Sequence, residues 1–220
     1  VREWLDQVAE RAKEYPEWVD VFERCYTDTL DNTVEILDDG STFVLTGDIP
    51  AMWLRDSTAQ LRPYLHVAKR DPRLRQTIAG LVKRQMILIL KDPYANSFNI
   101  EENWKGHHET DHIDLNGWIW ERKYEVDSLC YPLQLAYLLW KETGETSQFD
   151  ETFVTATKEI LHLWTVEQDH KNSPYRFVRD TDRKEDTLVN DGFGPDFAVT
   201  GMTWSAFRPS DDCCQYSYLI

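Results

Sequence analysis

The chain has 220 residues, and 24 Lys and Arg against 39 Asp and Glu give it a formal net charge of −15. Hydrophobic residues make up 41% and aromatic residues 13% of the chain, which excludes intrinsic disorder and suits a domain with a sizeable core. The acid excess argues against a nucleic-acid partner, because such proteins present basic faces to phosphates, and against attachment to anionic lipid.

No segment predicts a membrane span. The longest aliphatic run, residues 86–90, is far shorter than the ~20 residues that cross a bilayer. The chain opens on charged, amphipathic sequence rather than a secretory signal, and it begins with Val1, as expected of a processed or trimmed protein. The sequence is therefore consistent with two locations: the cytoplasm, or an exported location reached after processing.

The first quarter of the chain predicts two helices and a β-hairpin. Apolar residues recur at helical spacing in residues 1–14, and again from Pro16 to about residue 30. Apolar and polar residues alternate over residues 33–46, on both sides of Asp39 and Gly40. This alternation is typical of a short antiparallel hairpin.

Two pairs of helices are predicted next, separated by a long polar segment. Asp56 and Ser57 resemble a helix cap, and we expect helices to about residue 67 and over residues 72–90. The apolar residues of the segment 92–116 follow neither a helical nor a strand period. Long irregular segments of this kind are often functional. Further helices are expected over residues 124–140 and 149–168, with Gly144 between them as a terminator.

This order of elements predicts an all-α fold, arranged as a toroid or solenoid of helical hairpins. An up-and-down bundle has shorter connections than this chain, and the absence of a fixed period disfavours a consensus repeat protein. Nine tryptophans are many for this length. Their number indicates core packing first, and contact with sugar rings second.

The cysteines and histidines favour structural roles over metal binding. Cys25, Cys130, Cys213 and Cys214 lack zinc spacing, so buried free thiols are expected. His108, Asp111 and His112 would suit zinc only on a helix, but the segment from His107 to His112 has no apolar face. A solvated loop and no metal are expected there.

Residues 46–57 form the first segment that can carry chemistry. Arg55 and Asp56 stand near a helix start, where such a pair can hold adjacent hydroxyls by donating from one side and accepting on the other. Trp53 can supply a stacking face. A helix cap with a structural ion pair explains the local sequence equally well.

Residues 118–127 form the second such segment. Trp118 and Trp120 alternate with charges of both signs, as at the rim of a cleft for a polar ligand, where Glu121 and Arg122 can bind hydroxyls. The alternative is a loop entering a helix, with Glu125 and Asp127 as acids of its first turn.

Residues 201–214 form the third segment. Asp211 and Asp212 are adjacent carboxylates near Arg208, in apolar and aromatic surroundings. A carboxyl that donates a proton near neutral pH needs a raised pKa, which desolvation or a neighbouring like charge provides. A helix capped by Ser210 is the alternative, and it is compatible with catalysis.

Together these segments resemble glycoside hydrolase family 125, the metal-independent exo-α-1,6-mannosidases. The resemblance covers essentially the whole chain. It rests on five motifs: Gly47-Asp-Ile-Pro-Ala-Met-Trp-Leu-Arg-Asp-Ser57, Asp92-Pro-Tyr-Ala-Asn96, Trp120-Glu-Arg-Lys-Tyr-Glu-Val-Asp-Ser-Leu-Cys-Tyr-Pro132, Leu163-Trp-Thr-Val-Glu-Gln168 and Thr200-Gly-Met-Thr-Trp-Ser-Ala-Phe-Arg-Pro-Ser-Asp-Asp212.

The resemblance implies an (α/α)6 barrel that removes α-1,6-linked mannose from non-reducing ends, with inversion and without metal or other cofactor. The implied substrate is an α-mannoside oligosaccharide or a glycan derived from N-linked chains. The resemblance makes Asp211 the general acid and places Arg55 and Asp56 around the terminal mannose. We further expect the remaining candidates to hold the sugar, shape the pocket or tune the acid: Trp53, Trp118, Trp120, Glu121, Arg122, Arg208 and Asp212.

One departure from the family is large. Its catalytic domain is roughly twice this length, and its general base, the second carboxyl that an inverting enzyme needs, is a glutamate in the C-terminal half. Residues 1–220 are therefore expected to be the N-terminal part of one (α/α)6 domain, inactive in isolation. A glucoamylase-like (α/α)6 glycosidase and a non-catalytic glycan-binding module remain as alternatives.

Overall fold

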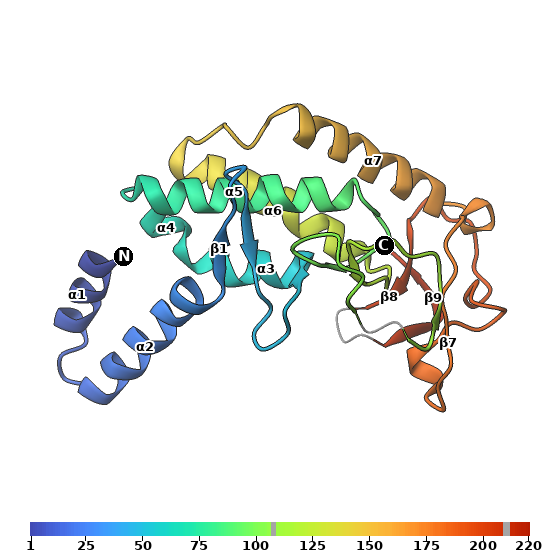
Figure 1. Ribbon diagram of the computed structural model, residues 1–220, viewed down its shortest axis with the longest axis horizontal. Helices are drawn as coiled ribbons and strands as arrows, with labels where there is room; N and C mark the ends of the chain where they lie inside the picture. Colours follow the sequence, from blue (N-terminus) through green and yellow to red (C-terminus); the bar gives the residue numbers. More distant parts are fainter. Residues whose placement is uncertain (107–108, 209–211) are drawn as a thin grey trace.

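The structure, a computed structural model, describes residues 1–106, 109–208 and 212–220. The molecule is elongated, and the chain begins at one end and finishes near the other (Figure 1). Helices α1 (Arg2–Arg11) and α2 (Pro16–Asn32) form an arm at the amino-terminal end. No side chain of α2 is buried, so this arm adds little to the core.

The central helices agree closely with those predicted. They are α3 (Leu54–Leu61), α4 (Leu65–Ala68), α5 (Pro72–Ile89), α6 (Val126–Thr143) and α7 (Glu151–Glu167), with short 3-10 turns η1 (Arg62–Tyr64), η2 (His170–Asn172) and η3 (Lys184–Asp186). Gly144 ends α6 in the left-handed conformation, as expected. The predicted cap at Asp56 is wrong: α3 begins at Leu54, which leaves Asp56 in the first turn. Over the described ranges, no helix is long and apolar enough to cross a bilayer.

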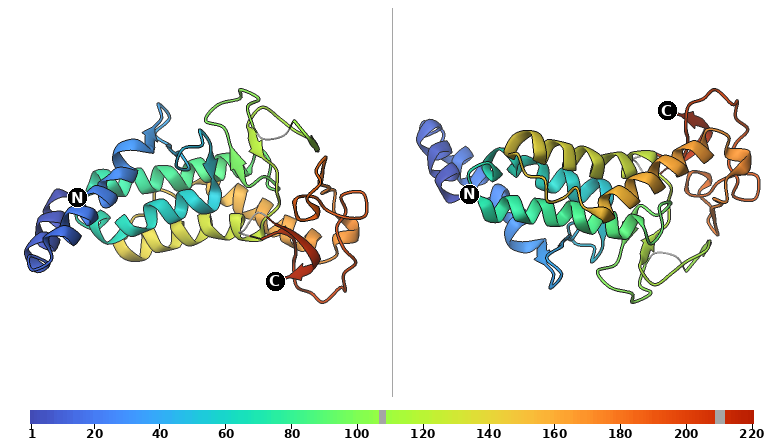
Figure 2. Two further views of the ribbon diagram at one scale, coloured as in Figure 1. Left: turned by 90° about the horizontal axis from the view of Figure 1, so that it is seen from below. Right: turned by 90° about the horizontal axis from the view of Figure 1, so that it is seen from above.

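Helix α5 organises the core. It contacts α6 on one side and α7 on another, and α3 packs against both α5 and α6 (Figure 2). Helices α6 and α7, the second predicted pair of helices, are thus each packed on α5. Fully buried Ile78, Leu81 and Met86 of α5 face Leu135 and Ile160 in one continuous apolar core.

Small sheets accompany the helices. The predicted all-α class with one β-hairpin therefore missed several short strands. Strands β1 (Val34–Ile36) and β2 (Thr42–Val44) form the predicted hairpin. The others pair as β3 (Met52–Trp53) with β4 (Ser97–Phe98) and β6 (Ile119–Glu121), β5 (Asp111–His112) with β7 (Val178–Arg179), and β8 (Trp204–Phe207) with β9 (Cys213–Leu219). Most are too short for an alternating pattern to show in the sequence.

Two further expectations are corrected by the structure. The chain around Asp212 forms the β8–β9 hairpin rather than a helix, while the expected cap residue Ser210 lies outside the described residues. Cys213 is a buried free thiol, as expected, but the free thiols of Cys25 and Cys130 are exposed. They lie on outer faces of α2 and α6, which the described chain does not cover.

Candidate functional site

The candidate site lies where the amino-terminal ends of α3 and α6 meet the sheet β3–β4–β6. In this sheet Trp53 pairs with Ser97, and Ser97 pairs with Glu121. Strand β3 runs directly into α3, so Arg55 follows Trp53 by only two residues. Trp53 and Trp120 are both buried, in a small apolar cluster with Ala51.

Arg55 is the centre of a charged cluster. Its Nη1 atom lies 3.0 Å from Glu125 Oε2 and 3.6 Å from Asp127 Oδ2, and its Nη2 atom lies 3.2 Å from Asp56 Oδ2. The side chain of Glu125 is fully buried and also accepts a hydrogen bond from Ser128 Oγ at 2.9 Å. Three carboxylates therefore surround one guanidinium, at the positive ends of two helix dipoles.

Burial and ion pairing shift the pKa values of this cluster in defined directions. Burial raises the pKa of Asp127, although the charge of Arg55 opposes that rise. Burial lowers the pKa of Arg55, but Glu125, Asp56 and Asp127 outweigh it, so the pKa of Arg55 is raised overall. Arg55 thus stays charged beside an excess of acceptor oxygens, an arrangement that suits the hydroxyls of a polar ligand.

Glu121 is held rigidly beside this cluster. Its Oε1 atom accepts a hydrogen bond from Asn96 Nδ2 at 2.8 Å, and its Oε2 atom lies 3.8 Å from Lys123 Nζ. The amide of Lys123 in turn donates to Asn96 Oδ1 at 3.1 Å. Glu121, Lys123 and Asn96 are all buried, so their hydrogen bonds fix the end of β6.

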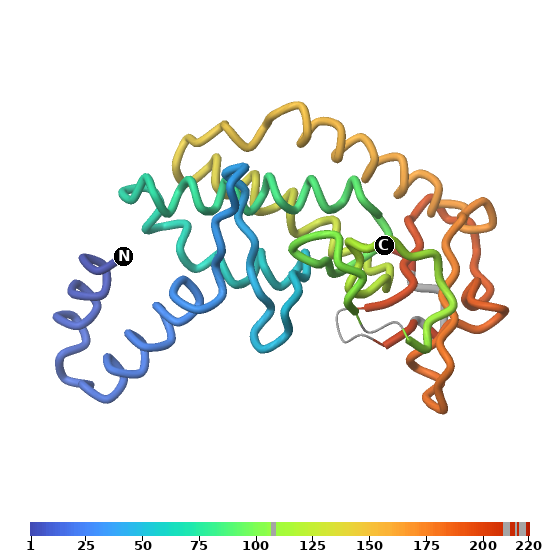
Figure 3. The backbone as a smooth tube through the Cα atoms, viewed as in Figure 1, coloured from blue at the N-terminus to red at the C-terminus, as the bar shows by residue number. Residues whose placement is uncertain are grey.

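The β8–β9 hairpin is attached to the start of α6. Phe207 forms a parallel bridge with Glu125, and its amide donates to the Tyr124 carbonyl at 2.9 Å. The trace in Figure 3 shows the segment before α6 running beside these strands. Arg208 and Asp212 pair at 3.0 Å across the end of the hairpin. Asp211, the expected general acid, lies outside the described residues.

The remaining candidates belong to other clusters. Arg122 pairs with Asp92 at 2.7 Å, and its guanidinium carbon lies 5.6 Å from the ring centroid of Tyr94 and 5.3 Å from that of Tyr175. Lys91 Nζ lies over the ring of Trp118, 4.7 Å from the ring centroid.

The histidine segment shows no helix in its described part. His112 lies in β5 and pairs with Asp180 at 2.9 Å, whereas His107 and His108 lie outside the described residues. Within the ranges that the structure describes, no three His, Cys, Asp or Glu side chains are grouped so that they can hold a metal ion.

Glu125 and Asp127 are site residues whose part in the cluster the sequence interpretation missed. It treated them as acids of a helix start, which they also are. Their contact with Arg55 spans about 70 positions of the chain. The sequence around Arg55 gives no local signal for this contact, which follows from the burial of the guanidinium and its need for carboxylate partners.

Comparisons with known proteins agree with these motifs. The family model described as metal-independent alpha-mannosidase (GH125) matches residues 15–220. A solved Streptococcus pneumoniae structure, from work on metal-independent alpha mannosidases and N-linked glycan processing, is 95% identical with a TM-score of 0.97; it is described as a non-productive complex with alpha-1,6-mannobiose. The meiotically up-regulated gene 157 protein of Schizosaccharomyces pombe is 35% identical over 241 residues.

These matches extend over nearly all of this chain but only part of each relative. The aligned region covers 100% of this chain and 51% of the Streptococcus pneumoniae chain. For the Schizosaccharomyces pombe protein, the corresponding shares are 98% and 47%. The chain therefore spans about half the length of both relatives.

Proposed function

The chain belongs to the family of metal-independent α-mannosidases, GH125, and on that premise we propose that the protein carrying it is an exo-α-1,6-mannosidase. Residues 1–220 form the N-terminal part of a single (α/α)6 catalytic domain. Two findings support the proposal: the family match over residues 15–220, and the mannobiose complex of the Streptococcus pneumoniae relative.

The observation that carries the proposal is the cluster around Arg55. A guanidinium and three carboxylates within 3.6 Å present donors and acceptors to the vicinal hydroxyls of a terminal mannose. The same cluster adjoins the β8–β9 hairpin through the Glu125–Phe207 bridge. A sugar held by Arg55 and Asp56 would therefore lie beside the β8–β9 hairpin, and Asp211 precedes Asp212 of that segment in the sequence.

In this mechanism Asp211 protonates the glycosidic oxygen as the mannosyl bond breaks. Arg208 and Asp212, which pair at 3.0 Å, tune and position this acid. Inversion requires a second carboxyl about 6.5–9.5 Å from the acid, because a water molecule must fit between that base and the sugar. The base comes from sequence beyond Ile220, so the isolated chain has no turnover.

The test uses the full-length protein with α-1,6-mannobiose, and proton NMR of the first product. We expect β-mannose to appear first, at a rate that a metal chelator does not change. Hydrolysis of isomaltose in preference to mannobiose would instead support a glucoamylase-like enzyme. Mannobiose binding in calorimetry without any turnover would support a glycan-binding module.

A further inference from the structure

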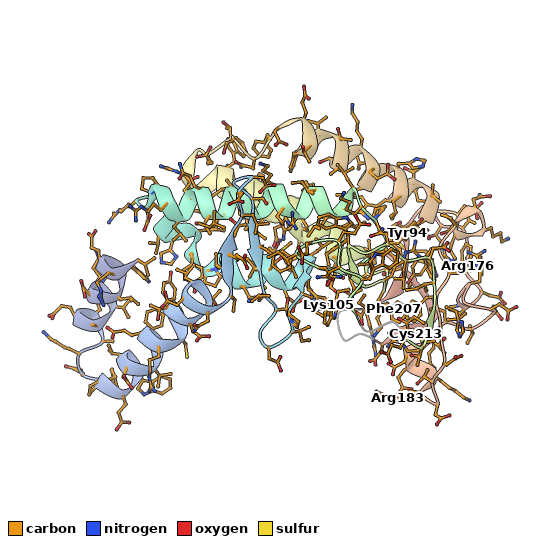
Figure 4. All side chains as sticks on the ribbon, viewed as in Figure 1. Tyr94, Lys105, Arg176, Arg183, Phe207 and Cys213 are labelled. Carbon is orange, nitrogen blue, oxygen red and sulfur yellow. The ribbon has the colours of Figure 1, made fainter. Side chains whose placement is uncertain are left out.

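Two motifs of the family resemblance have no part in the site, and the structure joins them. Tyr94, from residues 92–96, donates its hydroxyl proton to Glu167 Oε1 at 2.8 Å, and Glu167 belongs to residues 163–168. Both side chains are buried. Figure 4 labels Tyr94 at the end of the molecule where Phe207 and Cys213 of the β8–β9 hairpin also lie.

Glu167 Oε1 accepts a second hydroxyl hydrogen bond. Ser173 Oγ also donates to Glu167 Oε1, because this hydroxyl oxygen accepts the Tyr175 amide proton at 3.0 Å and keeps its own proton free to donate. Glu167 Oε1 thus receives two hydroxyl donors. A carboxylate that accepts several hydrogen bonds is stabilised in its charged state.

His170 lies between a carboxyl group and a backbone carbonyl. Its Nδ1 atom is 2.5 Å from Glu167 Oε2, and its Nε2 atom is 2.8 Å from the Phe193 carbonyl oxygen. The carbonyl requires a proton on Nε2, and the ionised carboxylate requires one on Nδ1. Each ring nitrogen of His170 therefore faces an oxygen that can accept a hydrogen bond from it.

The His170 ring stacks on Trp204, the first residue of β8. The two ring centroids are 3.6 Å apart, and the ring planes differ by 21°. A cation over an indole face is stabilised by the quadrupole of the ring. On another side, Gly194 approaches so closely that a Cβ atom there would lie 2.8 Å from Trp204 Cζ2. The Trp204 ring is thus confined between His170 and the loop that contains Gly194.

We propose that Glu167 and His170 form a buried ion pair, with both ring nitrogens of His170 protonated, and that this pair positions the β8–β9 hairpin through Trp204. Strand β8 connects Trp204 to Phe207, which is bridged to Glu125 at the site. His170 is a positioning residue, because it acts on the hairpin and not on the substrate. Its effect on catalysis depends on the proposed function, but its protonation state does not.

The protonation state is tested by NMR of the full-length protein labelled with 15N-histidine, at pH 7. The signals of His170 are identified by their loss in His170→Gln. We expect both ring nitrogens to carry protons that exchange slowly with water. One protonated and one bare nitrogen would overturn the proposal, whether or not the enzyme hydrolyses mannobiose.

Glu167→Gln tests the origin and the effect of the charge. The amide can donate to Nδ1, so His170 should become neutral with its proton on Nε2. We expect kcat on α-1,6-mannobiose to fall about 10- to 100-fold with less than about a threefold change in KM, as for a misplaced catalytic group. Glu159→Gln, an exposed change on the same helix, should leave both unchanged. Equal effects of the two substitutions on kcat, or a doubly protonated His170 in Glu167→Gln, would contradict the proposal.

Discussion

Arg55 illustrates how one side chain can serve structure and ligand binding together. The local sequence favoured a structural ion pair and a sugar contact equally, and the structure contains the ion pair with Glu125 at 3.0 Å. Because Asp56 and Asp127 also lie nearby, the pair leaves acceptor oxygens for a ligand. The two interpretations are therefore compatible.

Replacing Asp211 tests the assignment of the acid. In the full-length protein, Asp211→Asn should lower kcat on α-1,6-mannobiose by about 100- to 10,000-fold, because the amide cannot donate the proton that the leaving oxygen needs. Asp212→Asn should cost less, since it weakens the pair with Arg208 but leaves the acid in place. Steady-state kinetics of both variants provide the measurement. Near-wild-type activity of Asp211→Asn with loss of activity in Asp212→Asn would show that the acid is Asp212.

Replacing Glu125 tests the buried partner of Arg55. Glu125→Gln keeps the shape and an acceptor for Ser128 but removes the negative charge. We expect a loss of about 1–3 kcal/mol in the free energy of unfolding, since a hydrogen bond between charged groups contributes about this much. Urea denaturation measures it, with Glu142→Gln, an exposed change on α6, as the control. A loss no larger than that of the control would contradict a stabilising ion pair.

At the scale of elements, the helix starts show that cap chemistry depends on position. Asp71 precedes α5, and its Oδ1 atom accepts the amide protons of Arg73 and Leu74, both at 3.1 Å. Asp56 has the same side chain but lies inside the first turn of α3 and pairs with Arg55 instead. The cap position of α3 is Trp53, three residues before the predicted cap at Asp56.

The cap at Asp71 makes a pH-dependent contribution to stability. The Leu74 amide, first among several hydrogen bonds, lowers the pKa of Asp71 in the folded state. The contribution is therefore present above the unfolded pKa and is lost as the pH falls through the folded pKa. Asp71→Ala should lower the free energy of unfolding by about 1 kcal/mol at pH 7, and by less below about pH 3. Urea denaturation at both pH values checks this, and Asp71→Asn, which keeps the acceptor, should show the smaller loss at pH 7.

The loop before β8 depends on one glycine for close packing. Gly194 has φ of +102°, and a Cβ atom there would meet the Trp204 ring at 2.8 Å. Gly194→Ala should cost about 1–3 kcal/mol of stability from the backbone conformation alone, and more from the clash. Gly201 has φ of +85° with nothing within 4 Å of such an atom, so Gly201→Ala is the matched control. Thermal unfolding measures both variants. Equal decreases in their melting temperatures would contradict the packing role of Gly194.

At the scale of the whole molecule, large apolar side chains remain on the surface. Trp18 is 76% exposed, Tyr137 51% and Trp140 43%. The chain spans about half the length of its relatives, and exposed aromatic side chains on helix faces are expected where further helices of a toroid would pack. The proposal of one catalytic domain extending past Ile220 accounts for these faces.

Separating the chain from the rest of the enzyme tests that proposal. The isolated 220-residue chain should show no mannosidase turnover, should bind the dye ANS strongly and should be poorly soluble, because its apolar faces are uncovered. The full-length protein should bind little dye and hydrolyse α-1,6-mannobiose. Measurable turnover by the isolated chain would contradict the two-half arrangement.

The sequence by itself determined the features that depend on neighbouring residues. Periodicity predicted α5 almost to its ends, alternation around Gly40 predicted the first hairpin, and Gly144 marked the end of α6. The long motifs identified the family, which the match over residues 15–220 bears out. Such features are local, because helix hydrogen bonds, turns and caps join residues only a few positions apart.

Only the tertiary structure decided which distant groups meet. Arg55 pairs with Glu125 across 70 positions, and Tyr94 bonds to Glu167 across 73. The sheets β3–β4–β6 and β5–β7 likewise join short strands from separate segments. These contacts arise because the packed helices α3, α5 and α6 bring their ends together, and a buried charge is stable only where that packing supplies its partner. No local pattern carries that information.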